Sequence, residues 1–530
     1  MNTLLKNVFR IALISLLWTG CDDKFLDITP QSNITEANYY KTQQHAIETI
    51  TACYDPLKHP AFFNIDFFAL FESFSDEAVH EQAKLEHFII DASDDMVRML
   101  YTYLYKGVYR CNMAFEKIPP IQMDENLKKR LLGEAFYLRA FYNFYLTVLY
   151  NQPPLVLSVP KDIKIQLPNT PRAEFYKQII TDLEKAIDAL PEKSQYPLTD
   201  MGRATRGAAR ALLGKTYLYK ASYSPDADIR NDLTKAEKYF LDVVNSGEYA
   251  LSLPRINDSL NYVFAYLCNF SSLDLSTPAG SYKSENNIES LFEVQFHHGG
   301  WEKWEGGWQA DGSLTSLYFG PNSYRNLVPT LKFVNEFETL SSHPAGLHRD
   351  PRLYATVYQT GDTIVYTDPS RMAPEPWKDK VHTNSNITQG YGWKKYFYPA
   401  HVGPDGFHND PNNLRIIRYA DVLLMLAETE LLLGNEPAAR GYLNQVRSRA
   451  GLPAKSSVTK DDIIHERWVE LGFEWSRWFD LVRWSIREPK WITNIETILD
   501  GFKAGKNEFL PIPIREIDLM GGKLLQNPGW

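Results

Sequence analysis

Hydrophobic residues recur every three to four positions along most of this chain of 530 residues, which is the spacing of amphipathic α-helices. The pattern predicts helices over residues 37–57, 95–118, 128–149, 173–190, 204–223, 233–251, 418–434, 436–451 and 461–484. Segment 128–149 has apolar residues on more than one face, so we expect this helix to be well buried. In the last segment, Asp461 or Asp462 is the expected N-cap.

The spacing of small and aromatic residues relates two of these helices to each other. Leu213, Gly214 and Tyr217 lie on one helix, and Ala236 and Phe240 lie on the next. These spacings resemble a tetratricopeptide repeat, in which small residues let two antiparallel helices approach closely. We therefore expect the two helices to pack as a repeat unit.

The repeats are interrupted by a long segment of different character. A similar helix pair recurs over 418–451, and the helices within 128–190 look like a third, degenerate copy. Between the pairs, over 254–413, helical periodicity fades and Gly, Pro, Asn and Ser become frequent. Within it, "SLFEVQF" at 290–296 is typical of a buried strand. The tail, 485–530, is punctuated by proline and is expected to pack on the body as coil.

These segments predict a mainly α fold: a tetratricopeptide-like helical repeat scaffold with an irregular, loop-rich insertion that contains a few short strands. We expect a single domain over residues 21–530. In it, residues 37–251 and 414–484 form the scaffold, and residues 254–413 form the loop-rich region that binds ligand.

The first residues have the layout of a secretory signal. Lys6 and Arg10 precede an apolar run, and Thr19 and Gly20 place small residues before Cys21. The run is far shorter than the roughly 20 residues that cross a bilayer. We predict a lipoprotein signal peptide over residues 1–20, with Cys21 acylated. Trp18 stands where such signals usually carry Leu or Val, and the alternative is a plain signal peptide with an incidental cysteine.

Composition restricts the class of protein. The chain is 44% hydrophobic and 23% charged, as in soluble globular proteins, and its net charge of -9 argues against a nucleic-acid surface. The other cysteines are Cys53, Cys111 and Cys268, and none has CxxC spacing. We expect buried free thiols, with one disulfide as the alternative.

Aromatic residues are unusually frequent, at 13% of the chain, and three tryptophans gather in one stretch. Trp301, Trp304 and Trp308 lie in "FHHGGWEKWEGGWQADG", where pairs of glycines disfavour a helix, so we expect their rings on a loop after the 290–296 strand. An indole can pack on the C–H face of a sugar while polar neighbours bind its hydroxyl groups. The polar candidates are His297, His298, Glu302, Glu305, Gln309 and Asp311. The alternative is that these tryptophans pack inward.

Further candidates lie on both sides of this stretch. Tyr318 and Tyr324 are additional aromatic candidates for ligand contact, and Tyr391 and Trp393 are weaker ones. The 76–95 segment has no tryptophan, and its histidines, His80 and His87, are expected at the surface.

The sequence gives little support for a metal site or a catalytic centre. "DGFHNDPNN" at 405–413 offers oxygen ligands for a structural calcium ion but lacks EF-hand spacing, so a turn is favoured and no cofactor is expected. The chain has no GxSxG, HExxH or P-loop motif, which argues against an enzyme. Glu470, Glu474 and Arg477 suggest a salt-bridged structural helix.

Several motifs, in order along the chain, resemble the SusD/RagB family of outer-membrane nutrient-binding lipoproteins of Bacteroidetes. They are "CDDKFLDITPQS", "RYADVLLMLAE", "VRSRAGLP", "ERWVELGFEWSRWFDLVRW", and "LPIP" followed by "QNPGW". The resemblance runs from Cys21 to Trp530, and Asp22 and Asp23 resemble the acidic tag that directs such lipoproteins to the cell surface.

The resemblance implies a function and partners. It implies a non-catalytic protein, held on the outer membrane by lipid, that captures oligosaccharides and delivers them to a SusC-like TonB-dependent transporter. Peptide binding, as in RagB-like members, is the first alternative. A tetratricopeptide-type protein adaptor and a hydrolase are the others.

Overall fold

The computed structural model of the chain describes residues 39–60, 62–81, 83–162, 164–224, 227–297, 301–304, 307–310, 312–320, 324–364, 375–376, 390–397, 410–486 and 490–530. At 301–304, 307–310, 364 and 375–376 it describes the backbone alone. The predicted signal peptide and Cys21 lie outside the described residues.

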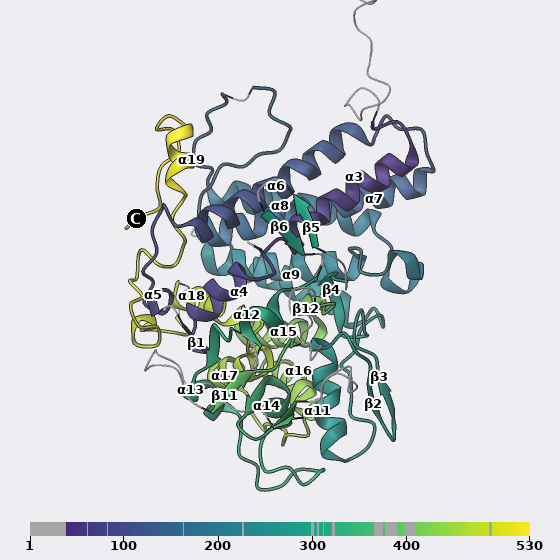
Figure 1. The fold of residues 1–530 in the computed structure, drawn as a ribbon, viewed down its shortest axis with the longest axis vertical. Coiled ribbons are helices and arrows are strands. Elements are labelled where there is room, and N and C mark those ends of the chain that lie inside the picture. The colour runs from purple at the N-terminus through teal and green to yellow at the C-terminus, as the bar shows by residue number, and fades with distance from the viewer. Residues whose placement is uncertain are drawn as a thin grey trace, which may run out of the picture.

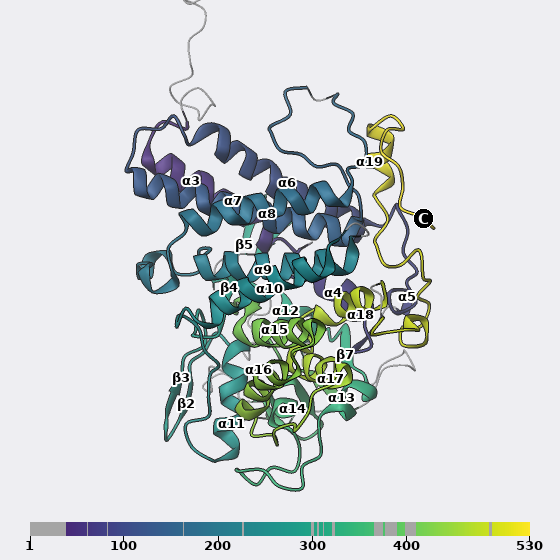
Figure 2. The ribbon, with the colours of Figure 1, turned by 180° about the vertical axis from the view of Figure 1, so that it is seen from behind.

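Helices packed one on the next form the scaffold, as predicted. They are α3 (Gln43–Tyr54), α6 (Asp95–Lys117), α7 (Glu125–Tyr150), α8 (Arg172–Ala189), α9 (Arg206–Tyr223), α10 (Ile229–Val244), α15 (Tyr419–Leu433) and α16 (Glu436–Arg449). Each helix from α6 to α10 packs on its successor, and α10 packs on α15 although the insertion separates them in sequence. Seen from behind, these helices form successive layers (Figure 2). The mainly helical fold with tetratricopeptide-like pairs is confirmed.

Caps and small residues explain why these helices begin and pair where they do. The Thr205 side chain accepts a hydrogen bond from the Ala208 N–H at 3.1 Å and so begins α9. A Cβ atom on Gly214 would lie 2.6 Å from the Phe240 ring, so only glycine lets α9 and α10 approach this closely. Helix α7 is buried on nearly every face after Leu131, as its pattern predicts.

The insertion contains short helices and strands joined by loops. They are α11 (Ser259–Leu267), β2 (Leu275–Thr277), β3 (Gly280–Tyr282), β4 (Ser290–Val294), β5 (Trp301–Trp304), β6 (Gly307–Ala310), α12 (Thr315–Phe319), β7 (Leu327–Pro329), α13 (Leu331–Glu336), α14 (Pro351–Thr356), β8 (Val357–Gln359), β9 (Thr363–Ile364), β10 (Glu375–Pro376), β11 (Tyr391–Trp393) and β12 (Leu414–Arg418). All described sheets are two-stranded and antiparallel. Figure 1 shows β5, β6 and α12 on the face of the helix stack turned toward the viewer.

An aromatic core joins the scaffold to the insertion. Helix α4 (Asp66–Ser73) leads to β1 (Ala78–His80) and α5 (Ala83–Glu86), and β1 pairs with β7 of the insertion. The Phe68 ring of α4 lies 4.7 Å from Trp475 and 5.7 Å from Trp393, between centroids. Trp393, a weak ligand candidate, is thus buried in the core.

The predicted helix 461–484 is two helices, which corrects the sequence-based expectation. Helix α17 (Lys460–Leu471) begins at the N-cap Thr459, not at Asp461 or Asp462, and α18 (Ser476–Ile486) follows a break. A Cβ atom on Gly472 would lie 2.3 Å from the Phe333 ring, so the chain passes close to α13 there.

Two residues after Gly472, in the break between α17 and α18, have left-handed backbone conformations. Phe473 and Trp475 have φ of 60° and 49°, and their N–H groups donate to the buried carboxyl groups of Glu77 and Glu72. Glu470, Glu474 and Arg477 are salt-bridged, but to other elements and not to one another. Local periodicity could not reveal these partners.

The remaining expectations concern cysteines, membrane spans and the tail. Cys53, Cys111 and Cys268 are buried and free, as expected. Among the described residues, no helix combines the length and apolar character needed to span a bilayer. The described part of the tail is mostly coil, with a 3₁₀ turn at Ile495–Thr497 and a short α-helix, α19 (Ile514–Leu519). It packs on the body, where the Leu510 N–H donates to the Leu149 carbonyl at 2.7 Å.

Candidate functional site

Strand β4 supports the stretch that carries the tryptophan cluster. It pairs with β12, and all residues of both strands are buried. The Glu293 carboxylate lies 3.2 Å from Arg415 Nε and accepts a hydrogen bond from Asn413 Nδ2 at 2.9 Å. These contacts fix the point at which the chain leaves the core. His297 follows directly and is exposed, so it is available to a ligand.

The tryptophans lie on a β-hairpin, which corrects the expected loop. Strands β5 and β6 are antiparallel, with Trp301 opposite Ala310, Lys303 opposite Trp308, and Trp304 opposite Gly307. A sharp reversal suits the glycine-rich sequence, and cross-strand hydrogen bonding then orders the backbone. The side chains of the three tryptophans lie outside the described part of the structure, so their contact with ligand stays a prediction. His298, Glu305 and Asp311 also lie outside it.

A cavity of about 330 Å³ lies beside the start of this stretch. Its walls come from α3 with the 3₁₀ turn after it, the loop before α9, and the end of β4. They are lined by Thr51, Tyr54, Asp55, Leu57, Lys58, Thr199, Asp200, Met201, Gly202, Arg203, Glu293, Val294 and Gln295. Gln295 is only two residues before His297, so the cavity adjoins the base of the hairpin segment.

Hydrogen bonds hold the polar wall of this cavity in place. The Arg203 guanidinium donates to Glu134 at 2.9 Å and lies 3.3 Å from Asp200. The Tyr54 hydroxyl donates to the same Glu134 carboxylate at 2.9 Å. Burial raises the pKa of Tyr54 well above its usual value, so this hydroxyl stays protonated. These hydrogen bonds hold Tyr54 and Arg203 in fixed positions, and a wall of fixed polar groups suits a hydroxyl-rich ligand.

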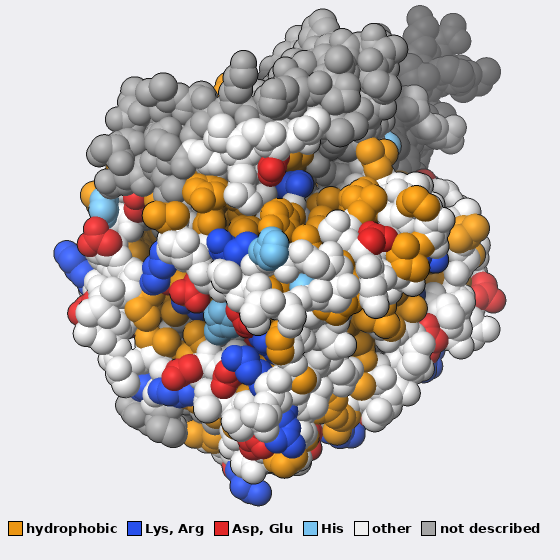
Figure 3. All heavy atoms as spheres, turned by 90° about the horizontal axis from the view of Figure 1, so that it is seen from below, with side chains coloured by type: hydrophobic (Ala, Val, Ile, Leu, Met, Phe, Trp, Pro, Cys, Tyr) orange, Lys and Arg blue, Asp and Glu red, His pale blue; other side chains and the backbone are white. Residues whose placement is uncertain are grey.

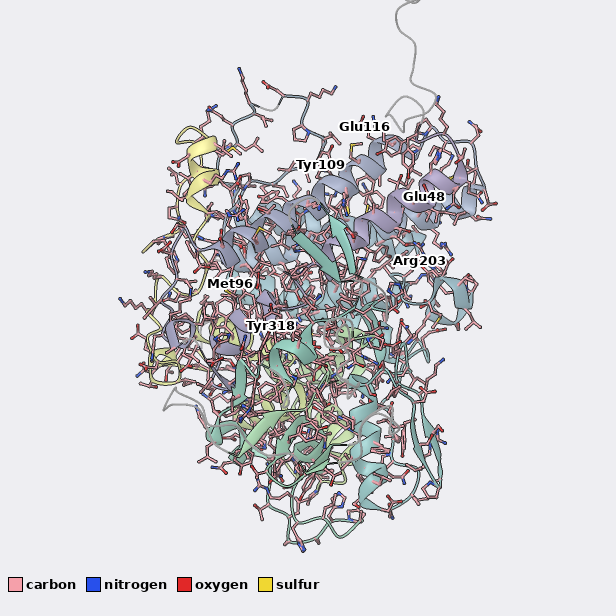
Figure 4. The ribbon with its side chains drawn as sticks, viewed as in Figure 1. Glu48, Met96, Tyr109, Glu116, Arg203 and Tyr318 are labelled. Atoms are coloured by element: carbon pink, nitrogen blue, oxygen red, sulfur yellow. The ribbon has the colours of Figure 1, made fainter. Side chains whose placement is uncertain are left out.

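The structure brings the two predicted tyrosines together. The Tyr318 and Tyr324 rings meet edge to face, with centroids 5.7 Å apart. Tyr318 is half-buried and Tyr324 is 54% exposed. In Figure 4, Tyr318 lies below the hairpin, and Arg203 lies to the right of the hairpin. Burial raises the pKa of neighbouring Asp66 to about 7. The tyrosine pair is a second aromatic surface on the side of the hairpin where the chain re-enters the body.

The 76–95 segment offers fewer surface side chains to a ligand than the sequence predicts. His80 is buried in β1, which corrects the expected surface location. It is buried because β1 pairs with β7 of the insertion. Burial lowers the pKa of His80 to about 4, so it is neutral. His87 Nδ1 lies 3.0 Å from Asp500 at the surface, as predicted.

The described part of the calcium candidate is occupied by protein contacts. Residues 405–409 lie outside the described residues. Asp410 is buried, and its carboxylate accepts from the Ser316 N–H at 3.0 Å. Asn412 accepts from the Ser272 N–H and donates to the Tyr396 carbonyl. In the described ranges, no three His, Cys, Asp or Glu side chains form a metal-binding cluster.

Sequence reasoning missed the cavity beside β4. Its lining residues come from three segments separated by 90 positions or more, and none of the segments carries a distinctive motif. The only signal in the sequence was the nearby cluster of tryptophans.

The end of the molecule seen in Figure 3 carries interspersed acidic, basic and hydrophobic side chains, with no broad region of one charge.

The fold defines a class of protein: a helical-repeat scaffold with an irregular insertion that contains short two-stranded sheets. A family model described as "SusD family" matches residues 289–530, and one described as "Starch-binding associating with outer membrane" matches residues 24–218. Together they cover most of the chain, which belongs to the SusD/RagB family.

Individual relatives agree with this assignment. A SusD-like protein of Bacteroides ovatus is 29% identical over 511 residues, covering 89% of this chain and 81% of the relative. A solved structure described as a laminarin binding SusD-like protein is 25% identical, with a TM-score of 0.73, covering 93% of this chain and 100% of that one. Surface glycan-binding protein A from Bacteroides thetaiotaomicron has the same fold, at 22% identity and a TM-score of 0.69, covering 92% and 99%.

Proposed function

We propose that this protein is a cell-surface lipoprotein that binds oligosaccharides without cleaving them and delivers them to a SusC-like TonB-dependent transporter in the outer membrane. Family membership supports the class of ligand, since two structural relatives are described as binding laminarin and surface glycans. The predicted lipidation of Cys21 would hold the protein on the membrane.

The observation that carries the proposal is the preorganised polar cavity at the base of a tryptophan-bearing hairpin. Sugar rings need an apolar platform for their C–H faces and fixed polar groups for their hydroxyls. The hairpin carries the three tryptophans, and Arg203 and Gln295 supply polar groups at the cavity wall. His297 and the Tyr318–Tyr324 pair extend this surface on either side of the hairpin.

Calorimetry of the mature protein against panels of neutral glycans and peptides tests the ligand class. We expect one or more glycans to bind, and Trp301→Ala, Trp304→Ala and Trp308→Ala, singly or together, to weaken binding about tenfold or more, since a stacked ring contributes about 1–3 kcal/mol. Trp491→Ala, outside the hairpin, is the control. Binding of peptides alone would contradict the proposal, as would new reducing ends after prolonged incubation with a bound polysaccharide.

A variant that fills the cavity separates it from the hairpin. Thr51→Tyr adds bulk at an exposed helical position in the cavity wall. Thr234→Tyr on α10 is the matched control, because both threonine hydroxyls donate to the carbonyl four residues earlier. Weaker glycan binding for Thr51→Tyr alone supports the cavity as part of the site. Delivery is tested by asking whether the tagged protein co-purifies with a TonB-dependent transporter.

A further inference from the structure

A larger cavity lies on the other side of the loop that precedes α9. Its volume is about 590 Å³, and its walls come from residues 193–201, residues 248–255 after α10, and residues 282–288 between β3 and β4. Met201 lines both this cavity and the one beside β4. The strands β2 and β3, which project at the right of Figure 1, lead into its wall.

Positive charges dominate the walls of this second cavity. Lys193, Arg255 and Lys283 line it, and Glu248 is the single carboxylate among its lining residues. Glu248 already accepts two hydrogen bonds from Ser194, from the N–H and from the hydroxyl, each at 2.8 Å. The walls therefore present an excess of positive charge to a ligand.

Two of these cations form no ion pair with a described carboxylate. The Arg255 guanidinium instead donates to the Ser281 carbonyl at 2.6 Å and lies 5.2 Å from the centre of the Tyr282 ring. Lys283 is exposed at the rim. Unpaired cations at the edge of a concave surface attract anions, because the surrounding low-dielectric wall strengthens their field.

Lys193 is held at the wall of the cavity by neutral acceptors. Its ammonium group donates to the carbonyls of Asn287 and Ser290, the second at 2.7 Å, and lies 5.4 Å from the centre of the Tyr249 ring. Burial lowers the pKa of Lys193 to about 8, and the nearby positive charge of Lys283 lowers it further. The negative charge of Glu293 opposes this shift. A bound anion would relieve both the burial penalty and this repulsion.

An apolar strip faces these cations. Leu253 is 59% exposed and Ile288 is 51% exposed, and both line the cavity with half-buried Leu251. Aliphatic side chains of this kind can cover the C–H face of a sugar ring. A smaller space of about 20 Å³, lined in part by Lys193, Met201 and Arg203, separates the two cavities, and Met201 lines both of them.

We propose that this cavity is a second ligand site, which binds the carboxylate or sulfate groups of an anionic oligosaccharide through Lys193, Arg255 and Lys283. The proposal rests on the proposed function in one respect, the saccharide nature of the ligand. An acidic peptide would offer similar charge, and the shared wall with the first cavity favours a saccharide.

Calorimetry with trigalacturonate, a sulfated carrageenan oligosaccharide and neutral maltotriose tests this site. We expect an anionic probe to bind, and the double variant Arg255→Gln/Lys283→Gln to weaken that binding at least tenfold. The control Lys177→Gln/Arg515→Gln makes the same change in charge at exposed positions outside both cavities and should bind as the wild type does. Added salt should weaken anion binding in the wild type more than in the Arg255/Lys283 variant.

The outcomes separate this proposal from the proposed function. A protein that binds neutral glycans but neither anionic probe would overturn the second site and leave the proposed function standing. Equal losses in the two double variants would overturn it as well, as would a hexa-aspartate peptide that binds more tightly than both anionic saccharides. Thr51→Tyr should leave binding of a short anionic probe unchanged. A protein that binds no saccharide of any kind would overturn both proposals.

Discussion

The helix stack and the junction around Glu470 are both buried, but different forces hold them together. Between α6 and α10, most buried side chains are apolar or aromatic, such as Leu138, Phe141 and Phe240, and the buried Arg139–Asp182 ion pair, at 2.8 Å, joins α7 to α8 among them. At the junction, where the insertion meets α17, the buried groups are charged. Glu470 accepts hydrogen bonds from Arg418 at 2.6 Å and Arg352 at 2.9 Å, and also from Arg449.

The junction joins segments far apart in the chain. Glu474 accepts from Lys395 at 2.8 Å and from Arg418 Nε at 2.7 Å, and Glu289 lies 3.3 Å from Arg449. The surrounding guanidinium groups hold the pKa of Glu470 far below its usual range, despite burial. Apolar packing tolerates many residues of suitable volume, whereas a buried ion pair requires each partner in place. The junction therefore fixes how the insertion sits on the scaffold.

The largest expected effect is at the centre of the junction. Glu470→Gln keeps the shape of the side chain but leaves three buried guanidinium groups without this charge, so we expect the free energy of unfolding to fall by about 3–5 kcal/mol. Urea denaturation measures it, and Glu184→Gln on the exposed face of α8 should change stability by less than about 0.5 kcal/mol. A Glu470→Gln protein as stable as the Glu184→Gln protein would show that the network adds little.

A smaller effect is expected from overpacking the stack. A Cβ atom on Gly107 of α6 would lie 2.3 Å from the Tyr142 ring, so Gly107→Ala should destabilise the protein by about 1–3 kcal/mol. Gly441 of α16 has no atom within 4 Å of the same Cβ position, and Gly441→Ala should stabilise by roughly 0.5–1 kcal/mol. Thermal and urea unfolding of the two variants measure these changes in stability. Changes of the same sign in both variants would contradict the close packing of α6 on α7.

The smallest expected effect depends on pH. Burial raises the pKa of Glu72 to about 7 and raises that of Glu77, which is hydrogen-bonded to Glu72, well above its usual value. Carboxyl groups with raised pKa favour the folded state at low pH. Their contribution is complete below about pH 4.5, the ordinary value, and declines as pH rises through 7.

The change Glu77→Gln keeps a hydrogen-bond donor to Glu72 without a second titrating group. Between pH 5 and pH 8, we expect the wild type to lose roughly 1–2 kcal/mol of stability relative to this variant. Urea denaturation at both pH values gives the difference. A difference between the two proteins that does not change with pH would mean that the carboxyl pair does not share a proton in the folded state.

How far the sequence predicted the fold differs between the two regions. Helices 95–118, 128–149 and 204–223 were predicted to within a few residues, because their periodicity and caps are local signals. The break at Gly472–Trp475 was missed, because it depends on contact with Phe333 and on the carboxyl groups of Glu72 and Glu77. In the candidate site, the tryptophan cluster was visible from composition, while its hairpin pairing and the adjacent cavity were not.

The sequence by itself determined the mainly helical scaffold, the small residues that pair its helices, and the stretch that carries the tryptophans. These features depend on neighbours within about one helical turn or on residue type alone. Only the tertiary structure decided which cations surround Glu470, that His80 is buried, and that two cavities share the loop before α9. Such features depend on contacts between residues tens to hundreds of positions apart, and no local pattern in the chain encodes them.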